Sequence, residues 1–143
     1  MASKRRTSSQ PVKKRPAREQ VAPSAVRLER GKGSKGRGDG PGGAYWHVFV
    51  GEQRVGNVYI NVIDEPPVGK HASIQIQLNV SAQGRGIASV AYGLAVKASE
   101  HDVVYAHMRK SNIASRKAAE HSGFVAVEDP GTPQMLMVWR RQS

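Results

Sequence analysis

Cysteine is absent from the 143 residues of the chain. Its absence excludes disulfide bonds, catalysis by a thiol and metal sites built on thiolates, and it fits a reducing compartment. The sequence also lacks any apolar run near the roughly 20 residues that a transmembrane helix needs, and its N-terminus has no hydrophobic region of the secretory type. We therefore expect a soluble, cytoplasmic protein with no membrane partner.

Acidic and large aliphatic residues are scarce in the first third of the chain. Residues 1–43 hold twelve Lys and Arg against three Asp and Glu, which is +9 of the total net charge of +11. A segment this rich in Gly, Pro and Ser cannot bury enough apolar surface to fold. We expect residues 1–43 to be a disordered basic tail, with residues 31–43 as a flexible linker and residues 25–28 as a possible short edge strand.

Two roles are open for the basic tail. It could be a solubilising appendage, or it could anchor the protein electrostatically to nucleic acid or to the ribosome. Residues 1–43 contain no aromatic side chain on which a base could stack. Any such binding should therefore be independent of sequence and strongly weakened by salt.

Alternation of apolar and polar residues predicts strands in a compact domain at residues 44–143. The clearest case is residues 72–79, where Ile74, Ile76 and Leu78 would share one face of a strand and polar residues the other. Gly, Pro and acidic residues between the apolar runs are typical of turns. Strands are expected at residues 45–50, 55–63, 72–79, 103–108, 124–127 and 135–139.

Two helices are predicted among these strands. The second should run from about residue 113 to residue 122, with Asn112 capping its start and Gly123 ending it. The first should cover residues 87–98, where apolar residues recur at helical spacing. Those residues are Ile87, Val90, Ala91, Leu94, Ala95 and Ala98. The element order is β-β-β-α-β-α-β-β, which predicts an α/β fold of the α+β type with a mixed sheet.

The segment from Gln83 to Ala88 lies between a predicted strand and the first predicted helix. Such a turn offers free backbone N–H groups and the positive end of a helix dipole to a phosphate, and Gly84 and Gly86 allow close approach. A diphosphate would fit it. The alternative is an ordinary Gly-rich loop, because a short motif of this kind is weak alone.

Downstream residues make the pattern more specific. The element order, the turn Gln83-x-x-Gly86-x-Ala88, and Asn112-x-x-Ser115 followed by Gly123-Phe124 together resemble the GNAT superfamily of acetyl-CoA-dependent N-acetyltransferases. The chain is most similar to the branch that acetylates N-termini of ribosomal proteins. The resemblance spans about residues 44–143.

The resemblance implies acetyl-CoA as a cosubstrate, with no metal. In this family the amides of the turn grip the coenzyme diphosphate, to which Arg85 could add a charged contact. The pantetheine arm pairs with the end of the preceding strand, where a backbone N–H near Ile76 or Leu78 would stabilise the oxyanion. The implied coenzyme-binding residues are Ile76, Leu78, Gln83, Gly84, Arg85, Gly86, Ile87, Ala88, Ser89 and Asn112.

Not all of the catalytic groups that are common in this family are present in the sequence. Many family members place a proton-donating tyrosine four residues before the Gly-Phe pair, and that position is Ala119 in this chain. The resemblance then points to Ser115 as the donor to the departing thiolate, although Ser115 could instead be an ordinary residue of a first helical turn, and Asn112 could be only a cap.

No carboxylate lies near Ala72, where some members place a general base. His71 is the nearest candidate for this role, because an unperturbed histidine has a pKa of about 6.5. His107 is a second candidate. Water could also carry the proton, and a lone histidine before a strand could simply be a surface residue.

The acceptor site also departs from the family. Its members begin with a strand and two helices that wall the substrate groove, whereas this fold is abbreviated at its N-terminal side. We expect an open groove, or one completed by a second subunit, in a monomer or homodimer. The open groove favours transfer to a protein or peptide amine. The alternative is a non-catalytic acetyl-CoA-binding module, tethered to nucleic acid or the ribosome by its tail.

Overall fold

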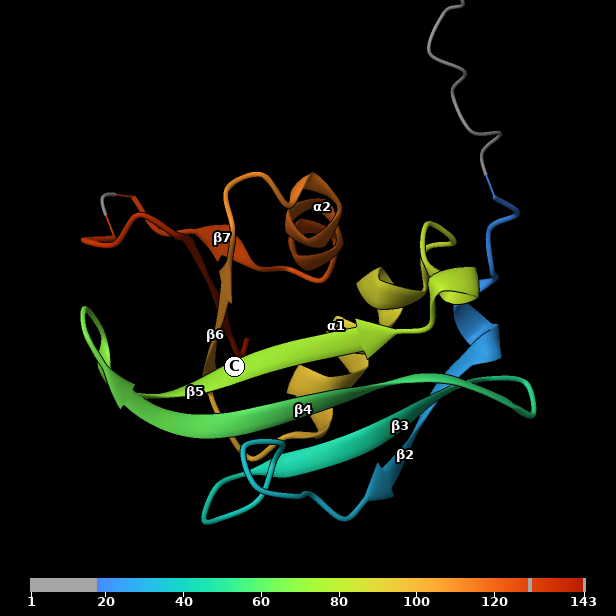
Figure 1. Cartoon of the computed structure of the whole chain (residues 1–143), viewed down its shortest axis with the longest axis horizontal. Coiled ribbons are helices and arrows are strands. Elements are labelled where there is room, and N and C mark those ends of the chain that lie inside the picture. The colour runs from blue at the N-terminus through green and yellow to red at the C-terminus, as the bar shows by residue number, and fades with distance from the viewer. Residues whose placement is uncertain (1–17, 129, 143) are drawn as a thin grey trace, which may run out of the picture.

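The computed structural model describes residues 18–128 and 130–142. Within them, seven strands form one mixed sheet in the order β2-β3-β4-β5-β6-β8-β7 (Figure 1). The strands are β2 (Val26–Gly31), β3 (Ala44–Val50), β4 (Gln53–Glu65), β5 (Gly69–Leu78), β6 (Val103–Met108), β7 (Val125–Ala126) and β8 (Met135–Arg140). The helices are α1 (Ile87–Ala98) and α2 (Ile113–His121), with short 3-10 turns η1 (Pro23–Ala25) and η2 (Val80–Ala82). None of these helices is long and apolar enough to cross a membrane.

The predicted α/β fold with a mixed sheet is confirmed. Strands β2 to β5 pair antiparallel in chain order, and β5 then pairs parallel with β6. Only two residue pairs, Ala72 with Val104 and Ser73 with Tyr105, join β5 to β6. Beyond them the strands diverge, and Figure 1 shows β5 and β6 running in different directions. The C-terminal half of β5 is thus unpaired on its β6 side among the described residues.

Alternation along β5 positions its side chains as predicted near the centre of the sheet. Ile74 is 2% exposed and faces the core, whereas Gln75 is exposed. Ile76 and Leu78 follow the same face but remain half-buried. Their partial exposure follows from the divergence of β5 and β6, because no neighbouring strand covers them there.

Helix α1 packs on the core face of the sheet, but with a different buried stripe from the predicted one. Leu94 and Ala98 are exposed, while Tyr92 and Val96 are buried beside Ala91. The ring of Tyr92 packs edge-on against Phe124, with 5.8 Å between ring centroids. This aromatic contact joins α1 to the segment after α2. The periodicity therefore located the helix but not all of its buried face.

Residues 18–43 differ from the expected disordered tail. The possible strand at residues 25–28 is present as the longer β2, which pairs with β3 along its whole length and buries Val26 in the core. The domain therefore begins before residue 44. The remainder of the predicted tail, residues 1–17, lies outside the described residues.

The Gly-rich stretch after β2 is a compact loop held by distant residues. The Asn61 side chain accepts a hydrogen bond from the Gly38 N–H at 2.7 Å and donates one to the Gly36 carbonyl at 2.8 Å. The His101 Nε2 lies 2.7 Å from the Gly42 carbonyl oxygen. Composition predicted a flexible linker because these partners on β4 and after α1 are remote in sequence.

Two glycines of this loop differ in the space that would be available to a Cβ atom. Gly36 and Gly38 both have positive φ, but a Cβ on Gly38 would lie 2.3 Å from the Ala44 carbonyl oxygen, whereas one on Gly36 would meet nothing within 4 Å. We expect Gly38→Ala to lower the free energy of unfolding by about 3 kcal/mol and Gly36→Ala by about 1 kcal/mol, because only the first adds a clash to backbone strain. Urea unfolding of both variants tests this, and equal losses would contradict a specifically packed loop.

Candidate active site

The turn before α1 presents unused backbone donors. Gly84 and Gly86 adopt positive φ angles of 74° and 83°, and Gly86 is the N-cap of α1 without any side-chain cap. Within residues 18–128, no hydrogen bond engages the N–H groups of Gly84, Arg85 or Gly86. Together with the first amides of α1, they form a cluster of donors at the positive end of a helix dipole. Such a cluster favours an anion.

A cavity of about 420 Å³ adjoins this turn. Its walls come from the end of β5, the turn, the start of α1 and one face of α2. The structure brings nearly the whole predicted coenzyme set into these walls, and Ser115 lies there too. The predicted residues that line the cavity are Ile76, Leu78, Gln83, Gly84, Gly86, Ile87, Ala88, Ser89, Asn112 and Ser115.

Arg85 is the predicted residue that is absent from these walls. Its Nε donates a hydrogen bond to the Glu19 carbonyl at 3.0 Å, so the guanidinium is held against the segment that precedes η1. Gln20, from the same segment, lines the cavity instead. The composition of residues 18–21 is that of the predicted tail, so the sequence predicts no site residue there.

Two polar residues of α2 were also missed. Lys117 and His121 line the cavity together with Ala114 and Ala118. These four positions have the i, i+3, i+4, i+7 spacing of one helical face. Lys117 is two residues from Ser115 and five from Asn112, so helical spacing from the predicted site residues does not lead to it. Its ammonium adds a positive charge to the cavity wall.

Asn112 and Ser115 interact through the helix start. The Asn112 Oδ1 accepts a hydrogen bond from the Ser115 backbone N–H at 3.1 Å, which confirms the predicted cap. The bond fixes the first turn of α2, and with it the position of Ser115 on the cavity wall. Ala119, at the position where the family often carries tyrosine, is fully buried.

His71 and His107 form a pair on the opposite face of the sheet. Their Nε2 atoms lie 2.9 Å apart, and the Nδ1 of His71 lies 2.6 Å from the Gly69 carbonyl oxygen. A carbonyl only accepts, so the Nδ1 of His71 carries a proton. When both rings are neutral, His107 must donate from Nε2 to His71, which leaves the Nδ1 of His107 as the free acceptor.

The surroundings keep His107 neutral. Burial lowers its pKa, and the neighbouring His71 lowers it further, against an opposing contribution from Glu65. His71 itself is 7% exposed and packs edge-on against Tyr105, with ring centroids 5.1 Å apart. His107 lies where β5 and β6 begin to diverge, because Tyr105 pairs with Ser73 and His107 is the next residue on that face. His71 lies on the same face, just before the paired residues of β5.

The face that carries the histidines also holds a polar row. The Tyr59 hydroxyl donates a hydrogen bond to the Gln75 Oε1 at 2.8 Å, and the Tyr45 ring stacks beside Tyr59 with centroids 6.3 Å apart. Alternation places His71 and Gln75 on one face, opposite Ile74 and Ile76. From the sequence alone, this face is predicted only to be polar.

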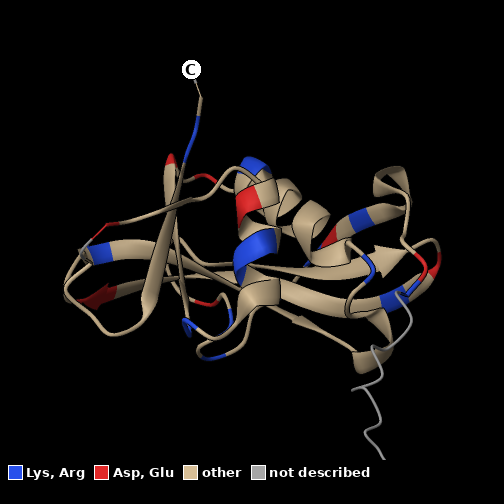
Figure 2. Cartoon of the chain, turned by 90° about the horizontal axis from the view of Figure 1, so that it is seen from above, with Lys and Arg blue, Asp and Glu red and all other residues tan. Residues whose placement is uncertain are grey.

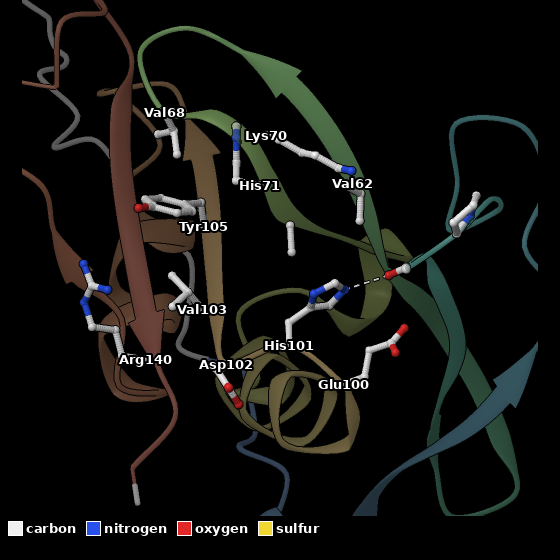
Figure 3. A pocket seen from close by; sticks show the side chains of 13 residues that line it. Val62, Val68, Lys70, His71, Glu100, His101, Asp102, Val103, Tyr105 and Arg140 are labelled. Carbon is white, nitrogen blue, oxygen red and sulfur yellow. Dashed lines mark hydrogen bonds between the residues drawn. The ribbon is translucent and has the colours of Figure 1, made fainter.

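A second cavity, of about 700 Å³, opens near the N-terminal ends of β5 and β6 (Figure 3). His71 and Tyr105 belong to its wall, with Lys70, His101 and Arg140. It is separate from the cavity beside the turn, since the two share no lining residue. No group of three or more potential metal ligands gathers anywhere in the part of the chain that the structure describes.

Solved proteins share the fold of this chain. AAC(6')-Ib in complex with paromomycin and acetyl-CoA superposes with a TM-score of 0.58 at 19% identity, over 71% of this chain and 66% of that one. RimJ of Mycobacterium smegmatis in complex with CoA-disulfide gives a TM-score of 0.55 at 21% identity, over 74% of this chain and 54% of that one. Such identities show the fold alone, and no curated protein matches the chain.

The solved relatives are longer proteins. This chain spans between about half and two thirds of their length, as the 54% for RimJ and the 66% for AAC(6')-Ib show. The two relatives do not distinguish the branch of the family. A family model described as the acetyltransferase (GNAT) domain matches residues 5–125. Because that match covers most of the sequence, the chain belongs to the GNAT acetyltransferase family.

Proposed function

We propose that this chain transfers an acetyl group from acetyl-CoA directly to a primary amine of a protein or peptide. One observation carries the proposal: a single cavity joins the amide-bearing turn, the unpaired end of β5 and Ser115. The turn would bind the coenzyme diphosphate, and Lys117 would add a positive charge beside it. The unpaired edge at Ile76–Leu78 would hold the pantetheine arm.

The tetrahedral intermediate needs an oxyanion donor and a proton for the thiolate. A backbone N–H of β5 near Ile76 would stabilise the oxyanion, because the edge of β5 there has no partner strand among the described residues. Ser115 would then donate its hydroxyl proton to the sulfur as the C–S bond breaks, and it would take a proton back from water. Ala119 supplies no functional group at the position of the family's usual donor.

The amine must lose its proton, and we assign the base to His107. The sequence favoured His71, but both ring nitrogens of His71 already have partners. His107 is neutral because its pKa is lowered, and its Nδ1 can accept the proton of the attacking amine. His71 would then be a positioning residue, which accepts from the Nε2–H of His107 and fixes its tautomer.

An open face supports a macromolecular acceptor. The coenzyme cavity lies on the side of α1 and α2, whereas His107, Tyr59 and Gln75 lie on the opposite face of the sheet. Between β2 and β3 the structure has only the Gly-rich loop, where the family resemblance implies two helices. A protein terminus could therefore approach His107 without a fitted small-molecule pocket. AAC(6')-Ib, by contrast, is an aminoglycoside acetyltransferase.

The positive charge of residues 1–17 would serve to bind polyanions. Residues 1–17 contain six Lys and Arg and no acidic residue. Figure 2 shows basic and acidic residues interspersed over the described part of the chain, so charge of one sign is concentrated at the N-terminus instead. Such a segment would bind polyanions without sequence preference.

Ser115→Ala tests the proton donor. We expect turnover to fall on the order of 100-fold, the usual contribution of a general acid, while the acetyl-CoA Kd stays within about twofold. Turnover is measured as the release of free CoA thiol with a panel of peptides, and the acetyl-CoA Kd is measured by calorimetry. Ser111→Ala, an exposed serine just before α2, is the matched control. Equal losses of turnover and affinity would mean that Ser115 is structural, and tight binding without any turnover in the unaltered chain would favour a binding module.

The pH profile tests the histidine pair. Because a lowered pKa keeps His107 neutral at pH 7, kcat/KM should stay level there and fall only below about pH 6.5, the ordinary histidine value. His107→Gln should remove this acidic limb together with most of the rate. His71→Asn should move the limb to higher pH, because it removes a charge effect that lowers the pKa of His107. An unmoved limb in His71→Asn would reject the positioning role.

Deletion of residues 1–17 tests the N-terminal charge. We expect the shortened chain to lose its salt-sensitive binding to a polyanion such as heparin or RNA, since six positive charges are removed. A salt series of filter-binding or chromatography measurements provides the comparison. Binding that persists with the same salt slope would instead place the basic surface within residues 18–142.

A further inference from the structure

The segment Arg18–Val21 lies along the outer side of the turn before α1. Figure 1 shows the start of the described chain, in blue, beside the yellow-green turn and η2. The Arg18 Nη1 donates to the carbonyls of Val80 and Gln83, the latter at 2.9 Å. We call this segment the strap.

Two more contacts hold the strap to the turn itself. The Gln20 Nε2 donates to the Gly84 carbonyl at 3.1 Å, and the Val21 N–H donates to the Arg85 carbonyl at 2.9 Å. The Arg85 Nε returns a bond to the Glu19 carbonyl. Val21 is packed against the hydrophobic core, and η1 leads from it directly into β2. The strap is therefore anchored to the sheet at its C-terminal end.

The strap binds one side of three consecutive peptide units. It occupies the carbonyls of Gln83, Gly84 and Arg85. In a planar trans peptide unit, the carbonyl of one residue and the N–H of the next point in opposite directions. Holding these carbonyls outward therefore turns the N–H groups of Gly84, Arg85 and Gly86 the other way. These are the amides left without a partner within the described chain.

A glycine-rich turn needs such a restraint. Gly84 and Gly86 have no Cβ to limit their backbone, so an isolated turn would sample many orientations of its peptide units. Ordering these units when a ligand binds would cost affinity, and an ordering contact formed in advance removes that cost. Gln20 also approaches Gly86 closely, since a Cβ there would lie 2.9 Å from its Oε1.

We propose that the strap is a positioning element that pre-forms the diphosphate site of acetyl-CoA, and that Gln20 is an additional wall residue of that site. The inference rests on the proposed function. It assigns to residues 18–21 a role in coenzyme affinity and not in the chemical step. Arg18 acts through the carbonyls that it holds, and its positive charge near the turn adds to the attraction for the diphosphate.

The test compares the full-length chain with Arg18→Ala/Gln20→Ala. Calorimetry with acetyl-CoA should show at least about a tenfold rise in Kd, as expected for the loss of three hydrogen bonds that order the site. Turnover at saturating acetyl-CoA should stay within about twofold, because Ser115 and His107 are untouched. In the coenzyme-free protein, amide exchange at residues 83–88 should be at least about fivefold faster, with global unfolding unchanged.

Two control variants separate the strap from general charge effects. Glu19→Gln changes a residue that contributes its carbonyl and not its carboxylate, and Lys32→Ala removes an exposed positive charge elsewhere. Both should leave the Kd within about twofold and the exchange of residues 83–88 unaltered. Deletion of residues 1–17 should do the same, since it leaves the strap in place.

The outcomes are distinguishable. If the unaltered chain binds acetyl-CoA and the double variant binds it equally well, the strap has no role and the inference is wrong, while the proposed function stands. Unchanged amide exchange in the double variant would reject the ordering role even if affinity fell. If the unaltered chain itself does not bind acetyl-CoA, the proposed function fails and the coenzyme role of the strap fails with it.

Discussion

The divergence of β5 and β6 is the constraint on which the rest of the structure depends. Two parallel pairs, at Ala72–Val104 and Ser73–Tyr105, hold the two halves of the sheet together, and after them the strands separate. Separation leaves the edge of β5 at Ile76–Leu78 without a partner strand and makes room for the cavity between β5, α1 and α2. An unpaired strand edge is costly unless something pairs with it, so this edge is suited to an extended ligand.

The same crossing point brings the titratable groups together. His71 precedes the paired residues of β5 and His107 follows those of β6, yet their Nε2 atoms lie 2.9 Å apart on the same face of the sheet. Ser115 reaches the site by another route, through the α2 start that Asn112 caps. The cavity proposed for the coenzyme, with Ser115 in its wall, lies on the side of α1 and α2, whereas the two histidines lie on the opposite face of the sheet. In the proposed reaction, the acetyl group passes between these faces at the divergence.

Residues 18–43 show how far composition can mislead. Gly, basic residues and few aliphatic residues are typical of disorder, yet residues 18–43 form a strap, an edge strand and a fixed loop. Each is stabilised by a partner remote in sequence: the turn at residues 83–85, strand β3, and Asn61 on β4. Few apolar residues suffice there because main-chain hydrogen bonds to an existing sheet supply the order.

Local patterns in the sequence determined much of this protein. Alternation located the strands, helical spacing located α1 and α2, and Asn112 marked the start of α2 because a cap is a contact between near neighbours. The turn at Gln83–Ala88 was identified in the same way. Tertiary structure alone decided which groups meet: the two histidines, the rings of Tyr92 and Phe124, and the strap and the turn. These contacts join residues 30 or more positions apart, and their geometry depends on how the whole sheet twists and divides.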